Sequence, residues 1–311
     1  MEPILEINGL SLSFTQYERG TRRRSLPVIR DLSLSIAPGE VAAVVGASGS
    51  GKSLLAHSIL GLLPYNSHLE GEIRFLGQPL TPQRTKKLRG REIVLVPQGV
   101  TYLDPLMKVG PQIRGGDRTE QARQRSRRAL ERYGLGTETE NLYPFELSGG
   151  MARRVLIASA VTTDPKLVIA DEPTPGLDAR AAGRVLGHFR EIAEGGAGVL
   201  LITHDLELAL TIASRVTVFY AGETVEEARA ADFTQDRLRH PYTRALWHAM
   251  PQNSFTPIPG TQPYPGAVTE GCLFAPRCPS SQPECQRAPV PYRPLRGGRV
   301  RCLHPEGGEV P

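Results

Sequence analysis

The chain has 311 residues, of which 40% are hydrophobic and 22% are charged, and its formal net charge is +5. This length allows one large domain with an appendage or two modest domains, and the composition is that of an ordinary globular protein. No apolar run approaches the ~20 residues of a membrane-spanning helix, and the first residues lack the basic-then-apolar pattern of a secretory signal. We therefore expect a soluble, cytoplasmic chain that relies on other chains for any membrane span.

The positive charge comes from arginine clusters at 22–24, 118–132 and 293–301. Such clusters can attract anionic lipid or nucleic acid. No aromatic-rich nucleic-acid module accompanies them, so solvated helix faces and loops are the simpler interpretation. We expect no nucleic-acid partner.

The first predicted elements form an antiparallel pair. Alternating apolar residues at 10–14 and 32–36 predict two half-buried strands around an arginine-rich loop at 17–27. The compact apolar run at 41–45 is typical of a buried parallel strand. It leads through a glycine-rich turn into a predicted helix at 54–63.

Strands and helices then alternate, which predicts a mainly parallel sheet covered on both faces. The segment 111–147 is polar and arginine-rich and predicts a helical insertion. Proline content rises beyond about 235, so we place a domain boundary there, between 1–235 and 236–311. The further strands are expected at 92–97, 167–171, 198–203 and 215–220, with helices near 151–163, 179–193 and 205–213.

The turn after 41–45 has the pattern of a phosphate-binding loop. Residues 46–53 read GASGSGKS and fit G-x-x-x-x-G-K-[ST] between a strand and a helix. Its glycines let consecutive N–H groups point at phosphate oxygens, and the helix N-terminus adds a favourable dipole. Lys52 is expected to reach the β- and γ-phosphates, and the Ser53 hydroxyl to ligate Mg²⁺. The candidate nucleotide-binding residues of the loop are Gly46, Ser48, Gly49, Ser50, Gly51, Lys52 and Ser53.

Two carboxylates end the apolar strand predicted at 167–171. Strand ends meet at the sheet edge where ligands bind, so Asp171 and Glu172 can both face the phosphate loop. Asp171 fits the role of holding Mg²⁺, and Glu172 that of polarising the attacking water.

Between and after these motifs, short segments resemble those of the ABC ATPase family. LSGGM at 147–151 is similar to the signature LSGGQ, and VPQ, ending at Gln98, looks like the Q-loop. PGLD, ending at Asp178, resembles the D-loop, and THD around His204 the H-switch. The resemblance implies an α/β P-loop NTPase fold, with an antiparallel β subdomain and a helical signature subdomain over about 100–163.

The same resemblance assigns roles to these residues. It implies that Ser148, Gly149 and Gly150 close over the γ-phosphate of ATP held by a second ABC ATPase subunit. His204 would contact the γ-phosphate, and Gln98 would touch Mg²⁺ and the water. Together with Glu172, these are the candidate catalytic residues, and Asp178 joins the nucleotide-binding set.

The residue that stacks on adenine has two candidates, and the signature departs from the family pattern at two positions. Phe14 is the first candidate to stack on adenine and Tyr17 the second, and core packing is the alternative role for Phe14. Met151 and Arg153 stand where many relatives carry glutamine, whereas Arg154 is the expected arginine. Because the SGG is intact and both Glu172 and His204 are kept, we expect a site competent for hydrolysis.

Three further stretches resemble the ATPases of oligopeptide, dipeptide and nickel importers. TYLDP at 101–105, with the residues up to Gln112, is similar to the segment that follows the Q-loop in these ATPases. YPFELSGG at 143–150 is similar to their YPHELSGG. HPYTRAL at 240–246 is similar to their HPYTRALL. The resemblance implies an ATP-hydrolysing subunit that powers import of a peptide, nickel or metal-chelate solute. It also implies a second, similar ATPase in a heterodimer, two permeases, an extracytoplasmic solute-binding protein and a place on the cytoplasmic face of the inner membrane. The signature variant SGGM slightly favours nickel or a metallophore as the transported solute.

All four cysteines lie in the tail, at Cys272, Cys278, Cys285 and Cys302. In a cytosolic chain such clustering favours metal over disulfides. The spacing C-x5-C-x6-C-x16-C fits no zinc-finger template, and four thiolates can hold zinc or a 4Fe–4S cluster. The tail resembles that of importer ATPases, some of which carry such a cluster, so the cluster ranks first, zinc second and free thiols third.

Two other functions compete with transport. One is a soluble ABC ATPase of a carbon–phosphorus lyase or nucleic-acid-associated complex, which should lack the 101–112 segment or the cysteine tail. The other is a non-catalytic regulator, against which the intact Glu172 argues.

Overall fold

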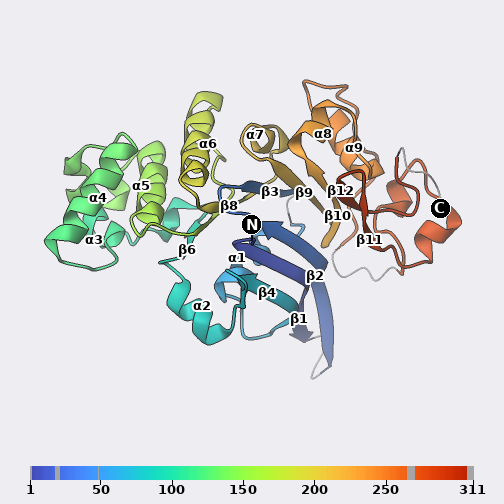
Figure 1. The fold of residues 1–311 in the computed structure, drawn as a ribbon, viewed down its shortest axis with the longest axis horizontal. Coiled ribbons are helices and arrows are strands. Elements are labelled where there is room, and N and C mark those ends of the chain that lie inside the picture. The colour runs from blue at the N-terminus through green and yellow to red at the C-terminus, as the bar shows by residue number, and fades with distance from the viewer. Residues whose placement is uncertain (1, 18–21, 48, 265–269, 307–311) are drawn as a thin grey trace.

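The computed structural model describes residues 2–17, 22–47, 49–264 and 270–306. Ser48, one of the expected phosphate-loop residues, falls outside these ranges. The molecule is elongated: helices α3, α4 and α5 form one end, the C-terminal extension forms the other, and the sheet lies between them (Figure 1).

Within the described ranges the strands join in one sheet of order β5-β4-β1-β2-β10-β9-β3-β8-β7-β6, with β12 added to β10 and β11 to β12. The strands are β1 (Leu5–Tyr17), β2 (Arg23–Ile36), β3 (Val41–Gly46), β4 (Ser67–Phe75), β5 (Gln78–Pro79), β6 (Ile93–Val96), β7 (Leu167–Asp171), β8 (Gly198–Thr203), β9 (Arg215–Tyr220), β10 (Glu223–Arg229), β11 (Tyr292–Leu295) and β12 (Gly298–Arg301). The helices are α1 (Lys52–Leu60), α2 (Pro82–Leu88), α3 (Val109–Ile113), α4 (Glu120–Arg132), α5 (Gly149–Val161), α6 (Ala179–Glu194), α7 (Leu206–Leu210), α8 (Ala230–Thr234) and α9 (Pro241–His248).

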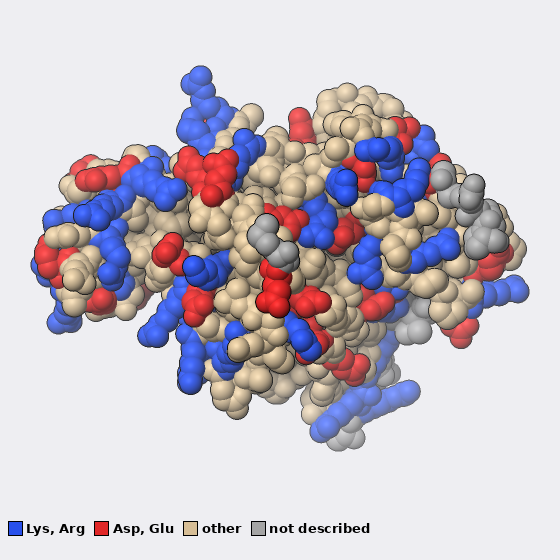
Figure 2. Space-filling view, viewed as in Figure 1, with Lys and Arg blue, Asp and Glu red and all other residues tan. Residues whose placement is uncertain are grey.

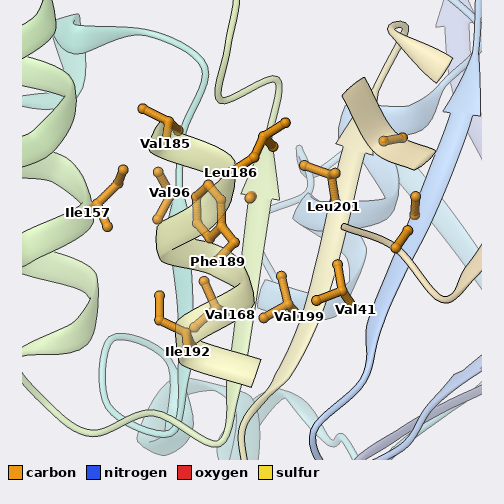
Figure 3. Close-up of a cluster of buried hydrophobic side chains, with 14 of the residues drawn as sticks. Val41, Val96, Ile157, Val168, Val185, Leu186, Phe189, Ile192, Val199 and Leu201 are labelled. Atoms are coloured by element: carbon orange, nitrogen blue, oxygen red, sulfur yellow. The ribbon is translucent and has the colours of Figure 1, made fainter. Parts of the chain in front are cut away.

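The predicted parallel sheet is confirmed. Strands β9, β3, β8, β7 and β6 run parallel as neighbours. Every residue of β3, β7 and β8 is buried, as expected for strands covered on both faces. Helix α6 covers one face with Val185, Leu186, Phe189 and Ile192, which recur at helical spacing and pack toward the strand side chains (Figure 3).

The predicted antiparallel pair is also present, and it is larger than expected. Strands β1 and β2 pair antiparallel with Leu10 opposite Leu32. Strand β4 adds to the other edge of β1, which the sequence analysis did not predict. Only Ile73 and Phe75 of β4 are buried, so its sequence carries too little apolar alternation to mark a strand.

The helical insertion contains α3 and α4, and the arginine-rich α4 is amphipathic. Its buried residues Ala122, Ser126, Ala129 and Leu130 lie on one face, which leaves the arginines toward solvent. On the face shown in Figure 2, Lys and Arg side chains are spread over all parts of the molecule with Asp and Glu between them. For α4 this agrees with the expected solvated helix face, whereas Arg301 of the 293–301 cluster is largely buried and binds Asp31.

The C-terminal extension continues the main sheet. Strand β12 pairs antiparallel with β10, with Glu226 opposite Val300. Beside this pairing, the buried Arg239 binds Glu226 at 3.1 Å and Asp232 at 2.9 Å, and donates to carbonyls of 295 and 296 in the β11–β12 turn. Among the described residues, no helix is both long and apolar enough to cross a membrane.

Candidate active site

The carboxyl ends of adjacent parallel strands bring the predicted motifs to one edge of the sheet. Strand β3 ends at Gly46, β7 at Asp171 and β8 at Thr203. Gln98 follows the end of β6, the next strand beyond β7. Open α/β sheets bind ligands in the crevice outside these strand ends, so the topology itself creates a ligand site here.

The phosphate loop depends on two glycines for different reasons. A Cβ at position 46 would lie 2.3 Å from the carbonyl oxygen of Phe219, because β9 passes directly beside the loop. Gly51 has φ 98°, which side chains rarely adopt, and directly precedes α1. The loop therefore curls tightly against the sheet and presents the N-terminus of α1.

Lys52 is folded back onto this loop. Its Nζ donates to the carbonyl oxygens of Gly46 at 2.8 Å and Ala47 at 2.9 Å, and the residue is only 6% exposed. Burial lowers the Lys52 pKa, while the charges of Glu172 and Asp171 oppose that shift. The ammonium group is thus held by neutral carbonyls and can exchange them for phosphate oxygens.

Ser53 and Asp171 form a second contact, between Oγ and Oδ1 at 3.1 Å. Burial raises the Asp171 pKa, the Ser53 hydrogen bond lowers it, and the neighbouring Glu172 charge raises it. A hydroxyl and a carboxylate oxygen are the hard donors that Mg²⁺ prefers. In addition, the buried Ser50 hydroxyl has no hydrogen-bond partner among the described atoms. These observations fit a site that receives Mg²⁺ and phosphate.

Glu172 is tightly positioned. Its φ is 46°, its N–H donates to Ile202 O at 2.8 Å, and its Oε2 accepts from Thr203 Oγ1 at 3.2 Å. His204 Nδ1 lies 2.9 Å from both Glu172 carboxylate oxygens. The structure thereby brings together Glu172 and His204, which the sequence analysis had placed in one site.

The signature residues lie on the surface. Ser148 caps α5 by accepting from the Met151 N–H at 3.3 Å, and Ser148, Gly149 and Gly150 are exposed. Among the described residues, no recorded hydrogen bond joins them to the phosphate loop. Asp178 is also exposed, and it caps α6 by accepting from the Ala181 N–H at 2.8 Å. A surface cradle of this kind can meet a ligand held by another molecule.

Gln98, Phe14 and Tyr17 have different surroundings. Gln98 is exposed beyond β6. Phe14 is half-buried on β1 and packs against the core beneath the antiparallel strands. Tyr17 is 64% exposed, with the Arg23 guanidinium 5.4 Å from its ring centroid.

Arg153 is a residue whose contacts the sequence analysis missed. Its guanidinium donates to the carbonyl oxygens of Glu172, Pro173 and Pro175, which follow β7. The only signal in the sequence was an arginine at a position where many relatives carry glutamine. That substitution does not indicate where the side chain points.

The four cysteines are free and line one small cavity together with His240 and His304. Backbone N–H groups hydrogen-bond the sulfur atoms of Cys272, Cys278 and Cys302. Burial raises the pKa of Cys272 to about 11 and, aided by the other cysteines, that of Cys302 to about 12. Within the described ranges, however, no three His, Cys, Asp or Glu side chains are arranged closely enough to hold a metal ion.

A larger cavity of about 790 Å³ lies beside the cysteine cavity. Cys278, Pro241 and Phe274 line both cavities. This larger space belongs to the extension, and the described phosphate-loop and signature residues do not line it.

Comparisons with known proteins agree on the two parts of the chain. Residues 29–175 match a family model described as ABC transporter, and residues 225–285 match one described as the C-terminal region of oligopeptide/dipeptide transporters. A putative peptide import ATP-binding protein of Brucella abortus is 37% identical, over 96% of this chain and 94% of that protein. The oligopeptide transport ATP-binding protein OppD of Salmonella typhimurium is 34% identical, over 97% and 94%.

A solved structure extends the likeness to the fold. A dimeric ATP-binding cassette in a post-hydrolysis state, bound to ADP and Pi, aligns with a TM-score of 0.63 at 26% identity. The alignment covers 73% of this chain and 98% of that one.

Proposed function

The chain belongs to the ABC transporter family as an ATP-binding, ATP-hydrolysing subunit, and on this premise we propose that it powers the import of peptides through partner permeases. The observation that carries the peptide assignment is the pairing of an ABC ATPase region with an oligopeptide/dipeptide-type C-terminal region in one chain. Relatives at 34–37% identity are named for peptide import or oligopeptide transport. Nickel or a metal chelate is the alternative cargo, without support from these relatives. The soluble, non-transport alternative is not favoured.

For nucleotide binding, we assign the phosphate loop and Lys52 to the phosphates of ATP. Lys52 would leave the carbonyls of Gly46 and Ala47 and turn to the β- and γ-phosphates. Ser53, Asp171 and Gln98 would hold Mg²⁺, which neutralises the charge that develops on the phosphates. Phe14, with Tyr17 as the alternative, would stack on adenine.

For hydrolysis, we assign Glu172 as the residue that orients and polarises water. The water oxygen attacks the γ-phosphorus, the bond to the bridging oxygen breaks, and ADP leaves as the water proton passes to Glu172 or phosphate. His204 holds the Glu172 carboxylate through Nδ1 at 2.9 Å. Its Nε2 would then face the γ-phosphate. Positioning of the water supplies most of the effect, because the reaction needs in-line geometry rather than covalent catalysis.

The exposed signature residues support a dimer of ATPase subunits. Ser148, Gly149, Gly150 and Asp178 would meet ATP held by a second, similar ATPase, so that ATP joins the two subunits. We assign this pair, a heterodimer, to the cytoplasmic face of the inner membrane, bound to two permeases and supplied by an extracytoplasmic solute-binding protein. The solved dimer bound to ADP and Pi is a structural precedent for such pairing.

The test is reconstitution of the full-length chain with its permeases, second ATPase and solute-binding protein in lipid vesicles. Phosphate release is measured with no solute, with short alanine peptides and with NiCl₂. Stimulation by peptides alone supports peptide import, and stimulation by NiCl₂ alone refutes it. Absence of ATP hydrolysis under all three conditions would refute the motor assignment itself.

The cysteine tail supports a second assignment, a four-thiolate metal centre. The four cysteines line one cavity, and backbone N–H groups hydrogen-bond three of the sulfur atoms, which favours their thiolates, while burial outweighs this effect and raises the pKa of all three. A 4Fe–4S cluster is the first candidate and zinc the second. Since no three of the described His, Cys, Asp or Glu side chains are arranged as ligands, binding would require the cysteines to move closer together. The metal centre would hold the proline-rich segment of the extension in a fixed position on the ATPase.

Anaerobic purification of the full-length chain tests this assignment. Iron, acid-labile sulfide and zinc are measured per chain for the wild type and for Cys278→Ser. About four irons and four sulfides per chain indicate a 4Fe–4S cluster, and about one zinc indicates a structural zinc site. A wild type without metal, or a Cys278→Ser variant with unchanged metal, contradicts the four-cysteine ligand set.

A further inference from the structure

Arg153 links the signature helix to the loop that carries the catalytic glutamate. It lies one turn into α5 and is 9% exposed. Its Nη1 donates to Glu172 O at 3.2 Å and Pro173 O at 2.5 Å, and its Nη2 donates to Pro175 O at 3.3 Å. A single side chain of α5 thus binds three backbone carbonyls of the loop that follows β7.

The loop that receives these bonds depends on a donor from outside. It runs from Glu172 to Asp178 and connects β7 to α6. Pro173 and Pro175 have no N–H, so they bring acceptors without donors to this loop, of which residues 172–174 are buried. Glu172 itself has φ 46°, a backbone conformation that costs free energy and persists only where the surroundings hold it. Arg153 is one of the groups that hold it.

Hydrogen bonds to these backbone carbonyls do not require the donor side chain to be charged. All three recorded partners are neutral carbonyls, and burial lowers the Arg153 pKa without removing its charge. Among the described atoms, its Nε has no partner although it is buried. A buried cation without a carboxylate is costly, so a purely structural link would be better served by a neutral donor.

The space beside Arg153 allows movement between the two elements. A cavity of about 470 Å³ lies next to the guanidinium, lined by residues that include Gly150 of the signature and Leu177 of the 172–178 loop. Tightly packed elements cannot shift past each other, whereas elements beside a cavity can. The helix and the loop are therefore joined by directional bonds at a place that borders this cavity.

We infer that Arg153 is a positioning residue for hydrolysis, which transmits the position of the signature helix to the backbone of Glu172. Ser148 to Gly150 stand at the exposed N-terminus of α5, where ATP held by the second subunit would engage them. A shift of α5 on engagement moves Arg153, and its three bonds move the loop and the glutamate with it. Hydrolysis in this chain thereby depends on whether the neighbouring site is occupied. This inference rests on the proposed function.

The test compares Arg153→Met, Arg153→Gln and Arg153→Lys in the assembled transporter. Met keeps an unbranched apolar stem and removes every donor, so we expect kcat to fall by about 10- to 100-fold with the KM for ATP within about twofold. Gln and Lys each restore part of the donor set and are expected to give intermediate kcat values. Arg184→Met is the matched control, because Arg184 lines the same cavity and no recorded bond in the described structure joins it to the loop.

A readout independent of hydrolysis separates positioning from damage to the signature. The Arg153→Met change is combined with Glu172→Gln, and the ATP-dependent dimer of ATPase subunits is measured by gel filtration. We expect the dimer to form as in Glu172→Gln alone. Loss of that dimer would overturn the inference, since it would place the defect in the signature cradle.

Other outcomes are equally decisive. Wild-type kcat in Arg153→Met, or an equal loss in Arg184→Met, overturns the inference. If Arg153→Met fails to fold, the other two variants decide. Wild-type kcat in both Arg153→Gln and Arg153→Lys then overturns the inference. A wild-type transporter that does not hydrolyse ATP refutes the proposed function, so the two failures are distinguishable.

Discussion

His204 Nδ1 lies 2.9 Å from both carboxylate oxygens of Glu172, although the two residues follow different strands. An ionised carboxylate only accepts hydrogen bonds, so Nδ1 carries the proton in this contact. Nε2 is then the ring nitrogen left for a ligand, and the His204 side chain is 53% exposed. The pair therefore combines a fixed carboxylate with an imidazole that faces the open site.

Glu172→Gln should separate nucleotide binding from hydrolysis. The amide keeps the shape of the side chain but cannot accept a proton from water, so we expect kcat to fall by about 100- to 10,000-fold. ATP affinity should stay close to wild type, and the ATP-bound dimer should accumulate. Phosphate release and gel filtration with MgATP measure the two effects. Glu207→Gln, an exposed position in the first turn of α7, is the control, and normal turnover in Glu172→Gln would remove Glu172 from the mechanism.

Asp171→Asn should stabilise the nucleotide-free protein while it abolishes Mg²⁺-dependent hydrolysis. Burial raises the Asp171 pKa, so the folded state binds more protons than the unfolded state between the usual value of 3.8 and the raised value. The free energy of unfolding of the wild type therefore falls as pH rises through that window. The increase in the free energy of unfolding that Asp171→Asn gives over the wild type is therefore complete at neutral pH, and it vanishes below pH 3.8.

Thermal unfolding without nucleotide measures this gain. We expect the Tm of Asp171→Asn to rise by about 2 °C or more at pH 7.5, which corresponds to ~1 kcal/mol in a domain of this size. A lower Tm in the variant would show that interactions with the ionised carboxylate outweigh its burial.

Arg239→Met should destabilise the extension strongly. Arg239 is buried between Glu226 and Asp232, and its removal leaves the buried Glu226 without a cation and Asp232 with only the exposed Arg237. We expect a loss of about 3–5 kcal/mol in the free energy of unfolding, measured by urea denaturation. Arg237→Met is the control: Arg237 also binds Asp232, at 3.5 Å, but is 56% exposed and should cost under ~1 kcal/mol. Equal losses would contradict the role of burial.

Phe14→Ala should lower the affinity for ATP by about 3- to 10-fold, because one stacking surface is lost. Fluorescent-nucleotide titration measures the affinity, and GTP serves to test base preference. Tyr17→Ala is measured in parallel. If only Tyr17→Ala weakens binding, adenine stacks on Tyr17, and Phe14 serves the core against which it packs.

The sequence was sufficient for elements that are defined by local pattern. The phosphate loop was predictable because its glycines and Lys52 are required at fixed spacing, and β3 because its run is wholly apolar. Strand β4 was missed because it is largely polar, and the pairing of β12 with β10 because it joins segments far apart in the chain. Long-range pairing leaves no periodic signal in either segment.

The candidate site shows the same division. Its residues were named from motifs, and the strand order that brings Asp171 beside Ser53 follows from parallel topology. The fold-back of Lys52 and the reach of Arg153 were not predictable. Both depend on where a long, flexible side chain finds carbonyls from another segment.

The pairing of β12 with β10 bears on how this protein can be shortened. The composition suggests that the chain could be cut near 235, yet such a cut would strip β10 of a neighbour and leave Glu226 and Asp232 without Arg239. Unpaired strand edges recruit other chains, so a truncated ATPase would tend to aggregate instead of forming a minimal enzyme. The extension thus protects a sheet edge of the motor, and any insertion or tag is better placed at its exposed surface than at the apparent domain boundary.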